Sequence, residues 1–96
     1  HIVAPDSMYS TTTLFLREIE EKFGIETSFV DATDAENYAE SIKENTKLFW
    51  LETPSNPLLK ISDIRAVTKI AKSKNVISVI DNTFATPFNQ RPFELG

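Results

Sequence analysis

Cysteine is absent from this sequence of 96 residues, and histidine occurs only once, at position 1. The chain therefore offers no thiol for a disulfide, a thiolate metal site or a cysteine nucleophile, and a metal centre of several histidines is excluded. Glycine is also scarce, with only Gly24 and Gly96. Two glycines so far apart cannot form a G-x-G-x-x-G or Walker A phosphate loop within these residues.

Long apolar runs and an excess of positive charge are missing as well. No run approaches the roughly 18–20 apolar residues of a membrane helix, and no charged segment followed by an apolar one indicates a signal peptide. The net charge is -4 and the isoelectric point is about 4.9, which argues against a broad basic surface. We therefore expect a cytoplasmic protein that binds neither nucleic acid nor a membrane.

Apolar segments of strand length alternate along the chain with segments of helical periodicity. Strands are predicted at residues 1–5, 26–30, 47–51 and 76–80. The last of these, Val-Ile-Ser-Val-Ile, has almost no polar alternation and is therefore expected to be buried on both faces. Amphipathic helices are predicted between the strands, and a loop is predicted beyond residue 86. This order is typical of an α/β fold with crossover connections, although it leaves the strand order open.

Several residues are predicted to begin or end these helices. The first helix, at residues 9–23, is expected to end at Gly24 in a left-handed cap. Thr33 and Glu36 have the spacing of a capping box, and Ser62 is predicted to cap the third helix. The hydroxyl run at residues 10–13 can cap the first helix, or that helix N-terminus can bind an anion.

Polar segments follow three of the predicted strands, at residues 6–13, 52–57 and 81–83. If these strands are parallel, the three segments meet at the carboxyl edge of the sheet, where open α/β folds bind their ligands. A functional site is therefore predicted at that edge.

Asp81 is the most informative residue of this predicted site. A carboxylate directly after a buried apolar strand is partly desolvated, which costs free energy unless a cation pairs with it. Asp81 can act as a metal ligand, a phosphoacceptor or the counter-charge of a protonated ring nitrogen. Equally, it can accept a hydrogen bond from the backbone of the following turn, as aspartates commonly do.

Asn56 and the aromatic residues allow two interpretations each. Pro54 and Pro57 restrict the loop around Asn56, which suits a hydrogen bond from its amide to a ligand, or simply a proline-rich turn after the strand. Tyr9 can stack on a flat ligand or staple the first helix to the sheet. Tyr38 and Trp50 lie within apolar patterns and are interpreted as core residues.

Three loop segments together resemble the Cys/Met-metabolism enzymes that depend on pyridoxal 5'-phosphate (PLP). These segments are Asn-Thr-Lys at residues 45–47, Glu-Thr-Pro-Ser-Asn-Pro-Leu-Leu at residues 52–59 and Asp-Asn-Thr-Phe-Ala-Thr-Pro at residues 81–87. The family includes cystathionine γ-synthase, cystathionine γ- and β-lyases, methionine γ-lyase and O-acylhomoserine sulfhydrylases. The resemblance extends over almost the whole chain and implies a three-layer, fold-type-I PLP-binding domain with a mostly parallel sheet flanked by helices.

The resemblance also implies roles for single residues. Asp81 matches the aspartate that pairs with the pyridine nitrogen of PLP, and Tyr9 matches the tyrosine that stacks on the ring and assists proton transfer. Asn56 matches an asparagine near the phenolic oxygen of the cofactor and the substrate carboxylate. Thr83 matches a residue on the opposite face of the ring. Glu52 belongs to the motif but is given no catalytic role, and no metal site is expected.

We therefore interpret residues 1–96 as an internal segment of the large PLP-binding domain. The lysine that carries the cofactor, the phosphate loop and the C-terminal domain are expected outside it, and neither Lys47 nor Lys60 matches the context of that lysine. The intact enzyme is expected to be a dimer or tetramer. It would form or cleave C–S bonds in sulfur-containing or homoserine-derived amino acids by γ-replacement or by γ- or β-elimination. The segment alone is expected to be inactive.

Two alternatives to this function stay open at this point. One is a small receiver-like signalling module in which Asp81 is phosphorylated. That module requires an acidic pair after the first strand and a lysine after a late strand, and Asp6 alone is a poor pair. The other is a structural segment that complements separately made parts of an enzyme.

Overall fold

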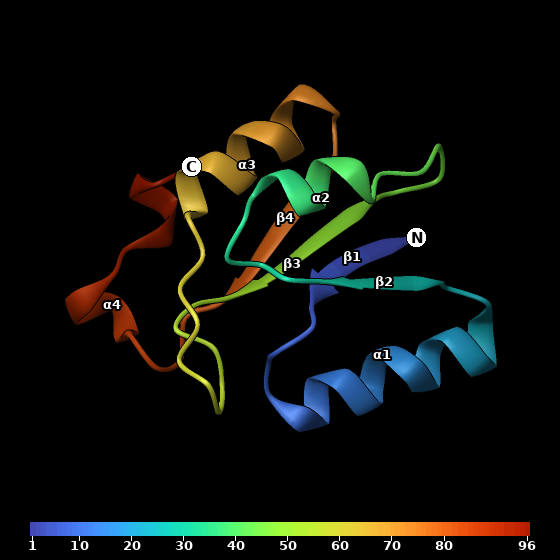
Figure 1. Cartoon of the computed structure of the whole chain (residues 1–96), viewed down its shortest axis with the longest axis horizontal. Helices are drawn as coiled ribbons and strands as arrows, with labels where there is room; N and C mark the ends of the chain where they lie inside the picture. Colours follow the sequence, from blue (N-terminus) through green and yellow to red (C-terminus); the bar gives the residue numbers. More distant parts are fainter.

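The computed structural model describes all 96 residues, and it contains one four-stranded sheet. All strands are parallel, in the order β2-β1-β3-β4, with bounds β1 (Ile2–Pro5), β2 (Thr27–Val30), β3 (Leu48–Glu52) and β4 (Ile77–Asp81). The helices are α1 (Ser10–Phe23), α2 (Glu36–Glu40), α3 (Ile64–Ser73), α4 (Thr86–Asn89) and the 3-10 helix η1 (Pro92–Glu94). The predicted α/β order of strands and helices is confirmed (Figure 1).

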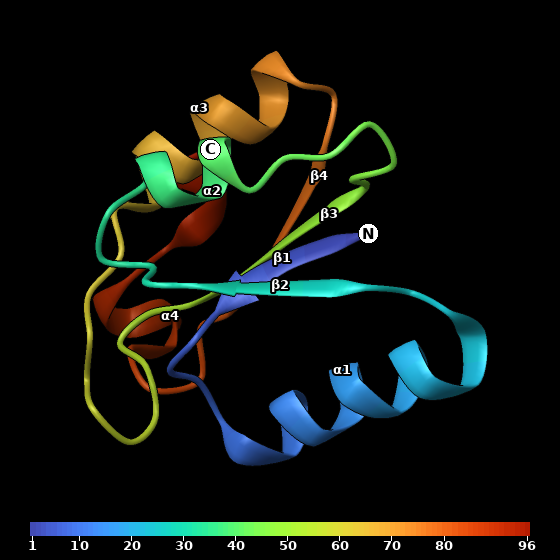
Figure 2. The same cartoon turned by 45° about the vertical axis from the view of Figure 1, so that its right-hand side comes forward.

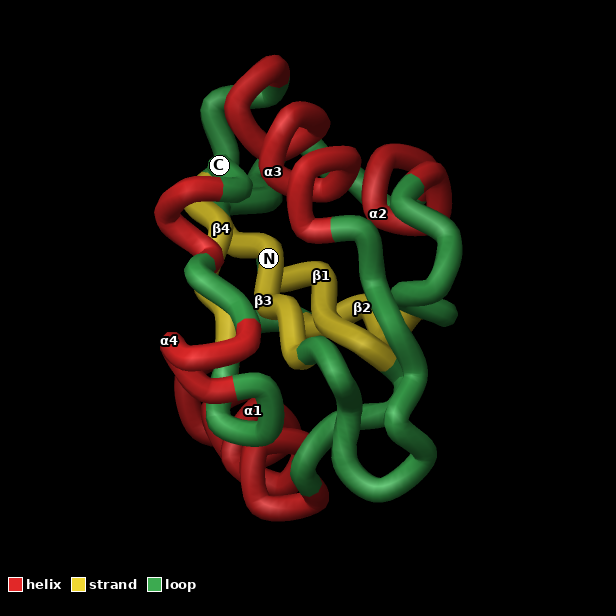
Figure 3. Tube along the Cα trace, turned by 90° about the vertical axis from the view of Figure 1, so that its left-hand side faces the viewer, coloured by secondary structure: helices red, strands yellow, loops and turns green.

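The helices cover the sheet in two layers, with α1 on one face and α2 and α3 on the other (Figures 1 and 2). The chain leaves β1 through α1 to reach β2, and then crosses through α2 to β3 on the other side of β1. The view along the sheet in Figure 3 shows the same three layers. The crossover direction therefore reverses between β1 and β3, which makes this the topological switch point of the sheet.

Alternation along the strands divides the core between the two faces of the sheet. On the α1 side, Leu16 of the helix packs with Ile2, Ala4 and Met8. The opposite side holds the larger cluster, whose buried members are Val3, Ala32, Tyr38, Phe49, Leu51, Val67, Ala71 and Val76. Tyr38 is fully buried and Trp50 packs against the α1-side cluster, as expected for core residues.

The capping predictions are only partly correct. Gly24 ends α1 with φ 68°, in the left-handed conformation predicted for it. However, Thr33 forms no capping box, because its amide and hydroxyl both donate to Asp31, and the amide of Glu36 donates to Asp34 instead.

The N-termini of the other two helices also differ from the prediction. Asp63, not Ser62, caps α3 by accepting a hydrogen bond from the amide of Ala66. Helix α1 begins after Tyr9, and no side chain there accepts a capping hydrogen bond from its first amides. The hydroxyls at residues 10–13 therefore do not cap the helix.

Burial of the last strand on both faces is a further prediction that the structure contradicts. Ile77 and Val79 lie on the α1 side of β4 and are 66% and 39% exposed. They stay uncovered because α1 packs near β2, at the opposite edge of the sheet from β4. Phe23, the last residue of α1, is also exposed, at 72%. Beyond residue 86 the chain forms α4 and η1, where a loop was predicted. None of the helices is both long enough and apolar enough to cross a membrane.

Candidate functional site

The three polar segments meet at the carboxyl edge of the sheet, as parallel strands require. A pocket of about 170 Å³ lies there, lined by Tyr9, Glu52, Pro54, Asn56, Asp81, Thr83 and Phe84. All four residues predicted for the site belong to this lining. Because Tyr9 follows β1, whereas Glu52 and Asn56 belong to β3 and the loop after it, the pocket spans the switch point between these strands.

Asp81 lies at the end of β4, directly in register with Glu52 on β3. Its side chain is half-buried, and one carboxylate oxygen accepts a hydrogen bond of 2.9 Å from the amide of Thr83. This is the turn contact that aspartates commonly make with the backbone of the residues that follow them. It leaves the carboxylate on the pocket wall, where the other oxygen can accept a hydrogen bond from a ligand.

Tyr9 and Asn56 present the other ligand-binding groups of the pocket. The Tyr9 side chain is 47% exposed and does not belong to either core cluster, which favours the ligand-stacking interpretation over the staple. Asn56 is half-buried in the turn after β3, and its side-chain amide forms no hydrogen bond within the chain. Both groups are therefore free to contact a bound molecule.

Glu52 joins the two loops that carry these residues. Its carboxylate accepts hydrogen bonds from the amide of Tyr9, at 3.0 and 2.9 Å, and from the amide of Asn56, at 2.7 Å. The residue is only 5% exposed. No role is predicted for Glu52 from the sequence, although this carboxylate at the end of β3 is desolvated in the same way as expected for Asp81. Pro54 and Phe84 were likewise not predicted to line the pocket, and no sequence signal distinguishes Phe84 from other exposed aromatic residues.

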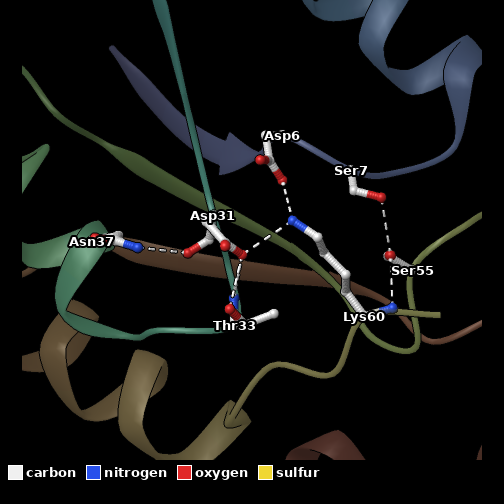
Figure 4. Close-up of polar contacts among 7 residues, drawn as sticks. All are labelled: Asp6, Ser7, Asp31, Thr33, Asn37, Ser55 and Lys60. Carbon is white, nitrogen blue, oxygen red and sulfur yellow. Dashed lines mark hydrogen bonds and ion pairs between the residues drawn. The ribbon is translucent and has the colours of Figure 1, made fainter. Parts of the chain in front are cut away.

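A second polar cluster joins the loops after β1, β2 and β3 (Figure 4). The amine of Lys60 lies between Asp6, after β1, and Asp31, after β2, at 3.2 Å from a carboxylate oxygen of each. Hydrogen bonds from Thr33 and Lys60 hold the pKa of Asp31 below its ordinary value, and the two carboxylates raise the pKa of Lys60. Lys60 thus pairs with these two carboxylates and does not line the pocket.

A third network holds the turn after β4. The side-chain amide of Gln90 donates to the carbonyl of Thr53, at 2.9 Å, and to the side-chain oxygen of Asn82, at 2.8 Å. The side-chain amide of Asn82 donates in turn to the backbone carbonyl of Gln90. These contacts connect the turn that carries Asp81 and Thr83 to the turn after β3.

Replacing Lys60 with methionine is expected to lower the melting temperature by a few degrees at pH 7. The depressed pKa of Asp31 means that its stabilisation is present above its ordinary pKa of 3.8 and is lost as the pH falls further. The raised pKa of Lys60 means that its stabilisation is present below 10.5 and is lost as the pH rises through the folded-state value. Thermal unfolding followed by circular dichroism should therefore show a difference at pH 7 that shrinks towards pH 3.

Lys22→Met is the matched control, because Lys22 pairs only with Glu18 on the exposed face of α1. An exposed pair of this kind contributes little. Equal effects of the two substitutions at pH 7 would contradict the role assigned to the Lys60 cluster.

The fold and the pocket together define a class of protein: an open, parallel α/β domain with a ligand site at its switch point. Comparison with known proteins identifies the family, since the profile of the Cys/Met metabolism PLP-dependent enzymes matches residues 1–96. The chain belongs to this family. The family resemblance and the fold class inferred from the sequence are thereby confirmed.

Individual relatives share much of the sequence. The chain is 47% identical to cystathionine β-lyase MetC of Bacillus subtilis and 42% identical to a probable cystathionine γ-synthase of Herpetosiphon aurantiacus, over 96 residues in each case. It covers 25% and 30% of their lengths, respectively. The crystal structure of a cystathionine γ-lyase from Lactobacillus plantarum complexed with L-serine superposes with a TM-score of 0.96 and 40% identity, over all of this chain and 25% of that one.

The receiver-like alternative loses its support at this point. Asp6, the only acidic residue after β1 that it could use, is bound to Lys60 and does not line the pocket with Asp81. The family that matches residues 1–96 is one of PLP-dependent enzymes and not of signalling modules.

Proposed function

We propose that these 96 residues are an internal segment of the PLP-binding domain of a longer enzyme, called the full-length enzyme below. The observation that carries the proposal is the convergence of Tyr9, Asn56, Asp81 and Thr83 on one pocket at the switch point. Its support from the comparisons is that the chain spans about a quarter of the length of its relatives while matching them throughout its own.

The residues of the pocket fit a flat heteroaromatic cofactor such as PLP. Asp81 supplies an acceptor with an oxygen left over from its turn contact, which suits a protonated ring nitrogen. Tyr9 supplies an exposed aromatic face, and Asn56 supplies an unengaged amide that can donate to an oxygen substituent. The aromatic face, the carboxylate and the amide come from the segments after three different strands, and they suit the apolar surface, the basic nitrogen and the oxygen substituent of such a ring.

PLP, when bound, supplies an electron sink for the carbon that loses its proton. Four residues of the chain would contribute to this chemistry. The Asp81 carboxylate holds the proton on the ring nitrogen, and Tyr9 stacks on the ring and moves a proton through its phenolic oxygen. The Asn56 amide would orient an oxygen substituent of the ring or the substrate carboxylate, and Thr83 would help to hold the ring within the pocket.

The reaction proposed for the full-length enzyme is the formation or cleavage of a C–S bond in a sulfur-containing or homoserine-derived amino acid. Relatives at 42–47% identity include proteins named as a probable synthase and as lyases, which supports this reaction class. Within this class of reactions, we favour γ-replacement or γ-elimination. We further propose that the enzyme works in the cytoplasm as a dimer or tetramer.

The test is an assay of the purified full-length enzyme with added PLP and cystathionine, or an activated homoserine ester with a thiol. Turnover that depends on PLP is the expected result, and the isolated 96-residue chain should show none. Robust turnover by the isolated chain would contradict the assignment as an internal segment. An inactive full-length enzyme with all of these substrates would contradict the reaction class.

A further inference from the structure

The geometry points to Glu52 as a positioning residue that sets the separation of Tyr9 and Asn56 across the pocket. This inference rests on the proposed function for its catalytic consequence. Its structural basis is independent of that function and lies in the contacts of one buried carboxylate.

The topology of the sheet separates the two loops that carry Tyr9 and Asn56. At a switch point, the loops after the two neighbouring strands depart to opposite faces of the sheet, here towards α1 after β1 and towards α3 after β3 (Figure 1). Their divergence creates the space for a ligand. It also means that helix packing on one face of the sheet does not fix both loops relative to each other.

Glu52 supplies a direct connection across this gap. Its carboxylate receives the amide of Tyr9 on both oxygens, at 3.0 and 2.9 Å, and the amide of Asn56 on Oε1, at 2.7 Å. Hydrogen bonds to an ionised acceptor are shorter and stronger than those to a neutral one. The backbone of both ligand-binding residues is therefore anchored to a single side chain on β3.

The position of Glu52 also explains why this anchor is built from a carboxylate. Tyr9 is the residue before α1, and that helix has neither a side-chain cap nor an acidic residue in its first turn. The amide groups at a helix N-terminus favour a nearby negative charge. Glu52 provides that charge from another strand, and at 5% exposure its carboxylate depends on these amides because solvent hardly reaches it.

Three variants of the full-length enzyme separate positioning from general stability. Glu52→Leu removes every acceptor with little change in size. Glu52→Gln keeps Oε1, which receives both the Tyr9 and the Asn56 amides. Thr53→Val is the matched control, because the hydroxyl of this neighbouring buried residue accepts one hydrogen bond, from the amide of Ser62 at 3.0 Å, and the residue does not line the pocket.

The first measurement is hydrogen exchange of the enzyme without added PLP, followed by mass spectrometry. In Glu52→Leu, exchange should become faster in both loops, at residues 7–11 and 54–58. Glu52→Gln should recover most of the protection, and Thr53→Val should change only the region near Ser62. Faster exchange in one loop alone, or the same pattern in Glu52→Leu and Thr53→Val, would overturn the inference.

The second measurement is steady-state kinetics with a saturating concentration of PLP. Misplaced reacting groups reduce turnover steeply, so Glu52→Leu should lower kcat about 100-fold, with a smaller change in KM. Glu52→Gln should restore most of the lost kcat. Equal kcat values for Glu52→Leu and Thr53→Val would overturn the inference. A wild-type enzyme without PLP-dependent turnover would instead refute the proposed function, while hydrogen exchange would still decide the role of Glu52.

Discussion

Replacing Asp81 with asparagine is expected to lower the turnover of the full-length enzyme about 10²–10³-fold while the protein stays folded. The expected loss follows from charge, because asparagine cannot supply the negative partner that keeps the ring nitrogen of PLP protonated. The fold should survive because the side-chain oxygen of asparagine can still accept a hydrogen bond from the Thr83 amide, which is the one hydrogen bond that the Asp81 side chain makes within the chain. Steady-state kinetics with saturating PLP measures the effect.

Asp34→Asn provides a control with the same change in charge and the same kind of turn. Asp34 accepts the amide of Glu36 at 3.0 Å, is exposed and does not line the pocket. This substitution should leave turnover within about twofold of the wild type, as distant surface changes usually do. If Asp81→Asn also retains full turnover, the assignment of Asp81 to the ring nitrogen is wrong.

Tyr38→Ala is expected to cause the largest loss of stability, about 3–5 kcal/mol of the free energy of unfolding. Tyr38 is fully buried in the core cluster on the α2 and α3 side of the sheet, and its ring lies 5.1 Å from that of Phe49. Burial raises the pKa of its phenol, so the hydroxyl stays protonated and donates to the carbonyl of Trp50 at 2.9 Å. Urea unfolding followed by circular dichroism tests the prediction.

Tyr38→Phe divides this loss into its two parts. Phenylalanine keeps the ring but leaves the Trp50 carbonyl without the phenol, which should cost about 1–2 kcal/mol. The difference in the free energy of unfolding between the two variants measures how much the buried ring contributes to stability. Equal losses from Tyr38→Phe and Tyr38→Ala would mean that packing against Phe49 contributes nothing, contrary to the structure.

The sequence predicts the fold well because the signals for it are local and repeated. Each apolar strand and each amphipathic helix has its own periodicity, and the alternation of the two kinds of segment determines the α/β class. The exposure of β4 could not be predicted, because it depends on which strands α1 covers and therefore on the strand order. The helix caps were mispredicted where a neighbouring aspartate competes with the expected hydroxyl, as Asp63 does with Ser62.

A site residue can be predicted from the sequence when its immediate neighbours in the chain are enough to single it out. Asp81 is recognisable because it directly follows an apolar strand, and Asn56 is recognisable because Pro54 and Pro57 restrict the loop around it. The role of Glu52 is not recognisable in this way, since it depends on Tyr9, which is 43 residues away in the sequence. The same holds for Lys60, whose partners Asp6 and Asp31 come from two other strands. Such contacts exist only once β1, β2 and β3 lie side by side.

The most direct test of the central claim is equilibrium binding of PLP to the full-length enzyme after removal of bound cofactor. We expect saturable binding of one PLP per chain, weakened about tenfold or more by Tyr9→Ala and by Asp81→Asn and unchanged by Asp34→Asn. The claim that this pocket holds the cofactor would be contradicted by the same dissociation constant for all four proteins, or by the absence of saturable binding.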